Sequence, residues 1–408
     1  MYSIICRNCK TKLHERAQWV VCPHCKGSIG FEYNASSLRF DSNSQSMWRY
    51  RELLPVQESQ EIVSLHEGYT PLEPAKSFPS GTVYLKNETI NPTGSHKDRA
   101  LSIGITKAVE FKRNAVMLYS DGSTALSSAA YAARAGIRTI VTVARSTPSY
   151  RLLPLIIYNA HIVEYQGEAA DALDWVHECC SELGLYETST YRRANPYECE
   201  GPKTIGLEIV DQMGCSPDWL VVPVGGGGTL AGIWRGLVEL DRLGVARNRT
   251  RMVGVLPAGF TALKSALEHS IRSENELWAL APAEPPATIQ AKIAMSRPPD
   301  GLEAVEAVRD SGGLLLFVSD EEVLVAQRDL ATREGIYAEP SGTAAYAGVK
   351  QLLQSGKVGL NESVVAVITG SGFRETATIH NETGLQVIRI SAGDGFNVIQ
   401  RILNRSNC

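Results

Sequence analysis

The stretch "NPTGSHKDRA" (Asn91–Ala100) holds a single lysine, Lys97, directly after a turn of small and hydrogen-bonding residues. Pro92 and Gly94 are typical turn formers, and the apolar spacing that follows predicts a helix with Lys97 in its first turn. A strand-like run, "TVYLKNE" (82–88), precedes the turn. A position between a strand and the start of a helix is unusual for a lysine that serves only as a solvated surface charge. We therefore treat Lys97 as a candidate reactive amine.

Continuous apolar strands alternate with helical stretches from Gly68 onward. Examples of the strands are "AVMLYS" (115–120), "DWLVVPV" (218–224) and "SVVAVITG" (363–370). This alternation predicts an α/β fold with parallel sheets covered by helices on both faces. Ligands of such sheets bind beyond the carboxyl ends of the strands. The proline-rich stretches "APAEPPATIQ" (281–290) and "SRPPDG" (296–301) are interpreted as connections around a surface stretch.

A glycine loop, Gly225–Thr229 in "VVPVGGGGTLAGIW" (221–234), lies between a predicted strand and a predicted helix. Its N–H groups and the helix N-terminus would form an anion cradle, to which Thr229 adds a hydroxyl. A dinucleotide fingerprint fits poorly, because the helix lacks the third glycine and the next strand ends in Pro257 and Ala258 without a ribose-binding acid. No Gly-Lys-Ser/Thr follows for a Walker loop. A single phosphate monoester is the better ligand.

Four cysteines near the N-terminus form two CxxC pairs, Cys6 with Cys9 and Cys22 with Cys25. Two such pairs complete the tetrahedral thiolate set of a structural zinc site, so we predict a zinc ribbon over residues 1–30. Four free thiols remain the alternative. A redox CxxC would need one pair beside a βαβ unit instead of two pairs within thirty residues.

Size and charge exclude some functional classes. The chain has 408 residues, with 40 basic and 44 acidic side chains, a net charge of −4. This balance favours neither a nucleic-acid nor a membrane partner. No apolar run reaches the length of a signal peptide or a bilayer span. We therefore expect a soluble cytoplasmic protein that acts on a small molecule.

A reactive lysine and a separate monophosphate cradle are the two requirements for binding pyridoxal phosphate. The chain resembles the threonine synthase family, within the fold-type II pyridoxal-phosphate enzymes related to the tryptophan synthase β chain. The resemblance rests on "LKNETINPTGSHKDR" (85–99), "NPYECEGPKTIGLEI" (195–209), "VVPVGGGGTLAGIW", "EGIYAEPSGTAA" (334–345) and "VITGSG" (367–372). It covers most of the chain beyond the ribbon. Zinc-ribbon N-termini also occur in some threonine synthases.

The resemblance implies a domain organisation and an assembly. It implies two α/β domains with parallel or mixed sheets covered by helices, in addition to the ribbon. The expected segments are a ribbon (1–30), a connecting arm (31–66), a large cofactor-binding domain (67–110 and 190–380), a small domain (111–189) and a C-terminal extension (381–408). The arm is interpreted as polar and irregular, and a homodimer is implied.

The resemblance also assigns roles position by position. Lys97 would bind the cofactor as a Schiff base and then transfer protons. Thr369 would contact the pyridine nitrogen with a hydroxyl, which leaves the ring largely neutral. The other implied contacts are Gly225, Gly226, Gly227, Gly228 and Thr229 with the cofactor phosphate, Ser123 with the cofactor O3′, and Ser95, Ser120, Asp121, Thr124, Asn195, Lys203 and Arg151 with the substrate.

Four positions depart from the family pattern. His96 replaces a phenylalanine, Ser123 and Thr229 replace asparagines, and Asp121 stands where serine or threonine is common. An acid beside the expected carboxylate site would repel the substrate unless it faces away or is protonated. Asp121 is also a candidate base or a contact for a second amino group.

We expect conversion of O-phospho-L-homoserine and water to L-threonine and phosphate. The alternative with the same cofactor is β-elimination or β-replacement on a serine-type substrate, as in cysteate synthase, dehydratases or diaminopropionate ammonia-lyase. A non-enzymatic zinc-ribbon protein that binds nucleic acid or a partner is the alternative from another class.

Overall fold

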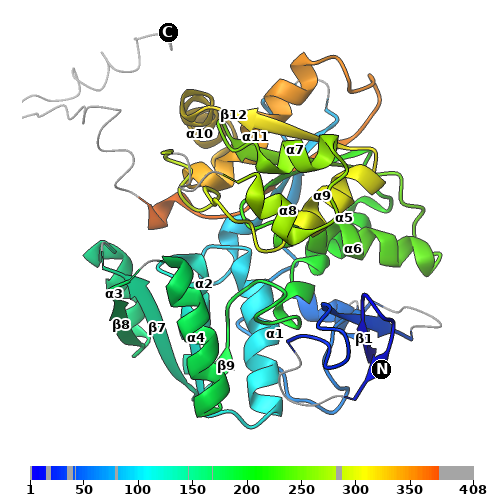
Figure 1. Cartoon of the computed structure of the whole chain (residues 1–408). Helices are drawn as coiled ribbons and strands as arrows, with labels where there is room; N and C mark the ends of the chain where they lie inside the picture. The colour runs from blue at the N-terminus through cyan, green and yellow to red at the C-terminus, as the bar shows by residue number, and fades with distance from the viewer. Residues whose placement is uncertain are drawn as a thin grey trace, which may run out of the picture. The chain divides into compact units, whose positions relative to one another are not determined.

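Three sheets organise the chain in the computed structural model (Figure 1). The structure describes residues 2–14, 20–34, 40–41, 43–78, 81–145, 147–167, 169–281 and 287–375. The described residues up to Arg374 form one compact unit. The predicted C-terminal extension, 381–408, lies outside the described residues. Within them, no helix combines the length and apolarity needed to cross a bilayer.

The largest sheet has six strands in the order β12-β11-β10-β13-β5-β4. All neighbours are parallel except β4 and β5, which are antiparallel. The strands are β4 (Leu72–Pro74), β5 (Val83–Asn87), β10 (Trp219–Pro223), β11 (Arg251–Pro257), β12 (Leu314–Val318) and β13 (Val364–Ile368). The register pairs Val364 with Val83 and Trp219 with Val364.

Helices cover both faces of this sheet because the strand residues that point to each face are apolar. On β10, Leu220 and Val222 pack into one core and Trp219 and Val221 into the other. The first core is closed by α5 (Lys203–Met213), α6 (Gly228–Arg242), α7 (Ala262–Glu268), α8 (Glu274–Ala279) and α9 (Gly301–Asp310). The second is closed by α10 (Asp320–Glu334) and α11 (Pro340–Gln354).

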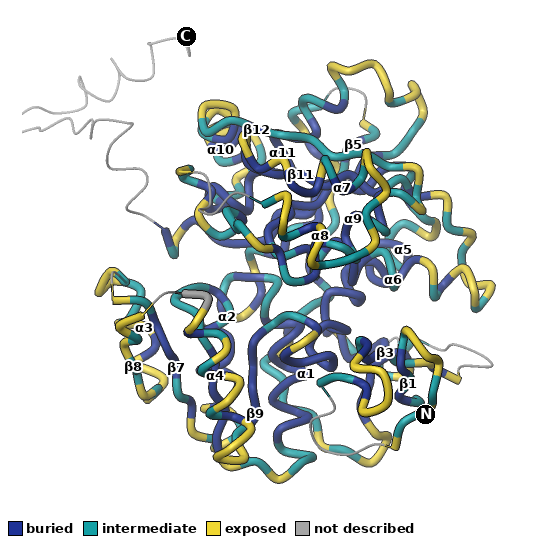
Figure 2. The backbone as a smooth tube through the Cα atoms, in the orientation of Figure 1, coloured by how far each residue is buried: buried dark blue, intermediate teal, exposed yellow. Residues whose placement is uncertain are grey.

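A second, fully parallel sheet has the order β8-β7-β6-β9. Its strands are β6 (Ala115–Tyr119), β7 (Arg138–Ala144), β8 (His161–Tyr165) and β9 (Tyr186–Glu187). Val116 and Leu118 face the helices α1 (Lys97–Glu110), α2 (Ser123–Ala135) and α3 (Ser149–Ile157), whereas Met117 faces α4 (Ala169–Leu183). Figure 2 shows α1 buried along most of its length. These two sheets confirm the predicted α/β class with parallel and mixed sheets.

The third sheet contains the cysteine-rich segment and extends beyond it. Its strands are β1 (Tyr2–Cys6), β2 (Lys12–Leu13) and β3 (Ile29–Tyr33), paired antiparallel in the order β2-β1-β3. The expected end of the ribbon at residue 30 therefore falls inside a strand. The cluster around Ile4 and Ile29 also includes Ile103 and Tyr197, so the ribbon shares a core with the body.

The connecting arm is more ordered than its composition predicts. The 3₁₀ helix η1 (Met47–Leu53) buries Met47, Trp48 and Tyr50, so the interpretation of the arm as irregular was wrong. The aromatic side chains explain the difference: Trp48 Nε1 donates to Glu67 Oε1 at 2.7 Å, and Tyr50 Oη donates to Asp211 Oδ2 at 2.9 Å.

Candidate active site

Lys97 begins helix α1 close to the carboxyl end of β13. The turn before it is fixed by a bridge between Ser95 and Gly370. The Lys97 Nζ donates to Thr190 Oγ1 at 2.9 Å. Burial lowers the pKa of Lys97, against the opposing influence of Cys199, Asp300 and Glu198. A lowered pKa increases the neutral fraction of the amine, which is the form that attacks a carbonyl carbon.

The glycine loop is pressed against Asp300. Gly227 has φ +98°, and a Cβ there would lie 2.4 Å from the Asp300 carbonyl oxygen. A Cβ on Gly228 would lie 2.6 Å from Asp300 Oδ2. Only glycine fits this path, and the path leads directly into the N-terminus of α6. The helix dipole and the N–H groups there favour an anion.

His96 connects the glycine loop to the end of β13. Its Nδ1 lies 3.1 Å from the Thr369 carbonyl oxygen and its Nε2 lies 3.1 Å from Thr229 Oγ1. Burial, and then the charge of Lys97, lowers the pKa of His96 to about 3. The ring is therefore neutral at pH 7. Because a carbonyl only accepts, the proton lies on Nδ1 and Nε2 accepts from the Thr229 hydroxyl.

Thr369 directly follows β13 and is 7% exposed. Its carbonyl oxygen accepts both the His96 N–H, at 3.0 Å, and the His96 ring. The next residue, Gly370, lies against the carboxylate of Glu339: a Cβ on Gly370 would be 2.5 Å from Glu339 Oε1. Thr369, which is expected to contact the ring nitrogen, thus lies near the glycine loop and Lys97.

The turn Ser120–Thr124 lies at the carboxyl end of β6, where α2 begins. The Ser120 Oγ accepts from Gly122 N at 3.2 Å. Asp121 Oδ2 accepts from Arg151 Nη1 at 2.7 Å, and Ser123 Oγ accepts from Arg374 Nη1 at 2.9 Å. The Arg151 guanidinium thus offsets the charge of Asp121, which removes much of the repulsion expected between this acid and a substrate carboxylate.

Asn195 and Lys203 are both buried and make hydrogen bonds or ion pairs within the protein. The Asn195 side chain is 2% exposed and donates to the Glu187 carbonyl oxygen at 2.8 Å. The Lys203 Nζ lies 2.9 Å from both Glu200 and Glu239, and it lines a cavity between the ribbon and α6. The structure thus gives both side chains protein partners, and their contact with a substrate stays a prediction.

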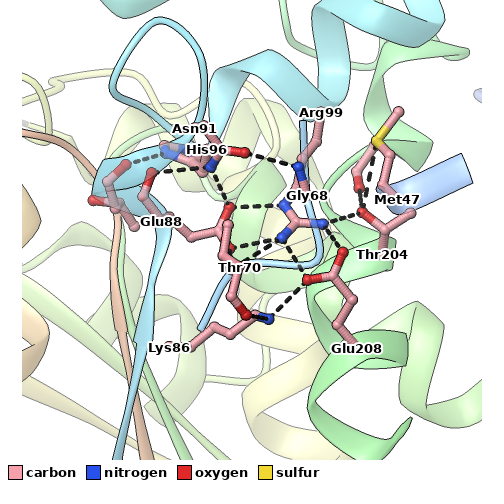
Figure 3. A network of polar contacts seen from close by, with 12 residues as sticks. Met47, Gly68, Thr70, Lys86, Glu88, Asn91, His96, Arg99, Thr204 and Glu208 are labelled. Carbon is pink, nitrogen blue, oxygen red and sulfur yellow. Dashed lines mark hydrogen bonds and ion pairs between the residues drawn. The ribbon is translucent and has the colours of Figure 1, made fainter. Parts of the chain in front are cut away.

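A buried network of charges holds the start of α1 in place (Figure 3). Arg99 binds Glu88 at 2.7 Å and Glu208 at 2.5 Å, and Lys86 binds Glu208 at 2.7 Å. All four side chains are fully buried. Burial alone would raise the pKa of Glu88, but Arg99 and Lys86 lower it to about 2. The network ties the first turn of α1, and with it Lys97, to β5 and α5.

Several residues of the site escaped the sequence interpretation. They are Thr190, Lys292, Asp300, Glu339 and Arg374. Glu339 lies within the motif "EGIYAEPSGTAA", and Arg374 lies two residues after the motif "VITGSG". Both motifs carry the family resemblance. Asp300 lies in the second proline-rich stretch (296–301), and Lys292 lies between the two stretches, in the segment interpreted as a surface stretch. That interpretation was wrong for Gln290, Ile293 and Asp300, which are buried.

The four N-terminal cysteines converge as the spacing predicts. Their sulfur atoms all lie within 4.8 Å of one another. Cys6 Sγ lies 3.4 Å from Cys25 Sγ, and Cys9 Sγ lies 3.8 Å from Cys22 Sγ. Tetrahedral thiolates around zinc stand about 3.8 Å apart. The cluster therefore fits a metal of zinc's size and geometry.

The residues around Lys97 fit pyridoxal phosphate. The glycine loop supplies backbone N–H groups at the N-terminus of α6, Lys97 supplies an amine with a lowered pKa, and Thr369 supplies a hydroxyl at a strand end. These are separate binding points for a phosphate, an aldehyde and a ring nitrogen. They come from three different elements that meet at the carboxyl edge of the six-stranded sheet.

Comparisons with known proteins agree with this fit. The family described as pyridoxal-phosphate dependent enzyme matches residues 63–370. Threonine synthase of Methanosarcina acetivorans is 34% identical over 390 residues, 93% of this chain and 94% of that protein. Threonine synthase of Methanocaldococcus jannaschii is 35% identical over 363 residues, 88% of this chain and 87% of that protein.

A solved structure supports the fold. The processed form of threonine deaminase isoform 2 from Solanum lycopersicum has a TM-score of 0.63 and 21% sequence identity, over 78% of this chain and 88% of that one. At this identity the likeness concerns architecture alone. Sequence and architecture agree, and the chain belongs to the pyridoxal-phosphate dependent enzyme family, with the fold-type II architecture.

Proposed function

We propose that the chain is a threonine-synthase-like lyase, which converts O-phospho-L-homoserine and water to L-threonine and phosphate. The observation that carries the proposal is the position of Lys97, an amine with a lowered pKa, beside a glycine cradle for a monophosphate. The threonine synthases at 34–35% identity over most of the chain support the choice of reaction.

When bound, pyridoxal phosphate supplies an aldehyde that condenses with amines and a ring that withdraws electrons. The glycine loop would hold its phosphate through backbone N–H groups, and the Thr369 hydroxyl would be the partner of the ring nitrogen, which leaves that nitrogen largely neutral. Lys97 removes the substrate's Cα proton and then takes part in removing a Cβ proton. Phosphate leaves from Cγ, a proton is added at Cγ to form the methyl group, water adds at Cβ, and a proton returns to Cα.

Other residues of the chain position Lys97 for these proton transfers and bind the substrate. Thr190 accepts a hydrogen bond from the amine and fixes its position, while Arg99 anchors the helix that carries it. Backbone N–H groups of the Ser120–Thr124 turn bind the substrate carboxylate, and Arg151 reduces the repulsion from Asp121. Orientation and anion binding are thus the contributions of the chain.

Three further proposals concern the state of the protein. Zn²⁺ is bound by Cys6, Cys9, Cys22 and Cys25 in a structural role, which the spacing and convergence of the sulfur atoms support. The resemblance to threonine synthases supports a homodimer. A cytoplasmic location remains the expectation from the sequence.

The test offers O-phospho-L-homoserine, O-phospho-L-serine and 2,3-diaminopropionate separately to the holoenzyme. We expect threonine and inorganic phosphate in equal amounts from the first substrate only. Lys97→Ala should lower turnover by more than about 10²-fold and should abolish covalent fixation of the cofactor by borohydride. The control Lys264→Ala, at an exposed lysine on α7, should behave as the wild type.

Turnover of phosphoserine or of the diamine alone would reject the synthase assignment and favour the β-elimination alternative. An unchanged chromophore in Lys97→Ala would reject the assignment of the reactive amine.

A further inference from the structure

Helix α3 presents an apolar surface to solvent. Leu153, Ile156 and Ile157 are 61%, 56% and 83% exposed, and Tyr150 and Tyr158 beside them are also exposed. Five of the thirteen large apolar side chains that are exposed in the described part of the chain thus fall within ten residues. Figure 2 shows most of this helix as exposed. Single exposed apolar residues are ordinary, but a contiguous group of them marks an interaction site.

The exposed residues of α3 lie on the side that faces away from the protein. Tyr150, Leu153 and Ile157 follow one another at spacings of three and four residues, so they share one side of the helix. Leu155 is on the opposite side and packs in one apolar cluster with Ile162 of β8. Helix α3 therefore packs on β8 with one apolar side and leaves a second apolar side uncovered.

Strand β8, on which α3 packs, is the last strand of the four-stranded sheet. Among the described residues it pairs with β7 alone, so its outer edge has no strand partner. Proteins commonly protect such an edge with a proline, a lysine or a bulge. The sequence "HIVEY" (161–165) contains neither proline nor lysine, and its register with β7 is regular. The outer edge of β8 is therefore open to a further strand.

The charges of α3 do not oppose contact between two copies of this surface. Arg151 is the one charged residue in the sequence of the helix. Its Nη1 binds Asp121 Oδ2 at 2.7 Å, so its charge is already offset within the chain. Two such helices can therefore approach each other without bringing unpaired like charges together.

The sequence of β8 is also compatible with pairing to itself. In an antiparallel pair of two β8 strands with Val163 facing Val163, His161 lies opposite Tyr165 of the second copy. Ile162 then lies opposite Glu164 of the second copy. No like charges are directly opposite, which is the arrangement that would weaken a cross-strand pair.

A second copy of the chain fits both features with one contact. A two-fold axis perpendicular to the sheet pairs β8 with β8 in antiparallel fashion and leaves both α3 helices on the same face of the joined sheet. Because each α3 packs on its own β8, the uncovered apolar sides of the two helices then meet. A different protein would have to supply an edge strand and an apolar helix in this same relation, whereas symmetry supplies both.

We propose that α3 and β8 form a two-fold contact between two copies of this chain. The contact joins two four-stranded sheets through their β8 edges and buries Leu153, Ile156 and Ile157 between the helices. A homodimer is supported by resemblance alone, whereas this surface is assigned from the chain's own residues. The inference does not depend on which substrate the enzyme converts.

The experiment measures the dissociation constant of the dimer by sedimentation of the holoprotein over a series of concentrations. The variants are Leu153→Glu, Ile157→Glu and their combination. The control is Val325→Glu, which changes a side chain that is 60% exposed on another helix, α10. A glutamate in the contact would be buried without a partner, whereas the control glutamate stays in water.

We expect the double variant to raise the dimer dissociation constant by about 100-fold or more, and the control to stay within about twofold of the wild type. Cofactor content and circular dichroism should be unchanged, because these side chains are exposed in a single copy. A wild type that is monomeric throughout the series would overturn the inference. A double variant that dimerises as well as the wild type would overturn the surface and leave a homodimer through another one.

A photoreactive p-benzoylphenylalanine in place of Ile157 identifies what covers the surface. Crosslinking of the purified protein, followed by mass spectrometry, should join this position to residues 149–165 of a second copy. Crosslinks to residues 376–408 of the same chain would instead assign the surface to that segment and reject the proposed contact. Neither result bears on the conversion of O-phospho-L-homoserine, so failure of this inference and failure of the proposed function are separable.

Discussion

His96 precedes Lys97, at a position where the resemblance leads us to expect phenylalanine. In the structure the imidazole fills a place between Thr229 and Thr369 and forms a hydrogen bond at each end. A phenyl ring could pack there but could not join the two segments. His96 therefore joins the end of the glycine loop, at Thr229, to the end of β13, at Thr369.

The lowered pKa of His96 leads to a pH prediction. The folded value is about 3 and the unfolded value is 6.5, so as pH falls below 6.5 the unfolded chain binds this proton first. The stability contributed by neutral His96 is complete above pH 6.5 and is lost as the pH falls toward 3. Between pH 7.5 and 5.5 this group should lower the unfolding free energy by up to about 1.4 kcal/mol.

Urea unfolding of the wild type and of His96→Gln at both pH values measures this effect. The His96→Gln variant should lack this pH-dependent loss of unfolding free energy. The control His269→Gln, at the exposed end of α7, should show the same loss as the wild type. An equal pH dependence in the wild type and in His96→Gln would contradict the assignment of a neutral, buried ring.

For individual residues, the sequence alone is enough to predict Lys97, the glycine loop and the cysteine cluster as candidates, because local spacing singles out each of them. It could not identify Lys292 or Arg374. Both approach the Ser120–Thr124 turn from residues more than 150 positions further along the chain, and no local pattern records such a contact. Asp121 was noticed as unusual, but its pairing with Arg151 came only from the structure.

At the scale of elements, the path from β10 into α6 depends on the absence of a side chain at Gly227. Gly227→Ala would place a methyl group 2.4 Å from the Asp300 carbonyl oxygen, at a residue with φ +98°. The loop or Asp300 must then move, and we expect cofactor affinity to fall by about tenfold or more. The measurement is a titration of the apoprotein with pyridoxal phosphate.

Gly244→Ala provides a matched control at the other end of the same helix. Gly244 has φ +70° and no atom within 4 Å of its added Cβ. The Gly244→Ala variant should lose about 1 kcal/mol of unfolding free energy through backbone strain, and its affinity for pyridoxal phosphate should stay the same. Equal affinities in the two variants would show that the loop tolerates a side chain and does not act as a cradle.

Most helices and strands were predictable because apolar runs and helical spacing are local properties. Helix α1 begins at Lys97 and strand β10 covers the run before the glycine loop, as the sequence indicated. The interpretation of the arm (31–66) as irregular was wrong for Met47–Leu53, because the order of this segment depends on long-range contacts. Tyr50 reaches Asp211, and Trp48 reaches Glu67 and Ser102, and composition does not report such partners.

At the scale of the whole molecule, the ribbon is part of the folded unit and not an independent appendage. Arg7, next to a cysteine of the cluster, forms an ion pair with Glu303 on α9. Glu303 also binds Arg192 at 2.7 Å and Arg235 at 2.9 Å. The backbone N–H of Arg192 donates to Asp300, which lies against the glycine loop. Contacts thus run without interruption from the ribbon to the phosphate cradle.

Metal removal should therefore affect more than the ribbon. We expect one zinc ion per chain by elemental analysis, and its loss in Cys9→Ser and Cys25→Ser, which alter exposed thiols and disturb little packing. Thermal unfolding should shift down by several degrees. The exposed Cys215→Ser is the control. A metal-free wild type with unchanged melting behaviour would contradict a structural role for the cluster.

Helix α1 belongs to two layers of the protein at once. Its first turn is held by Glu88 and Glu208 on the side of the six-stranded sheet, whereas the rest of its length packs with Val116 and Tyr186 of the four-stranded sheet. A ligand-driven domain closure therefore cannot hinge at this helix without breaking buried ion pairs. Any movement of the two sheets relative to one another would have to take place at other segments, and Lys97 would keep its position relative to the six-stranded sheet.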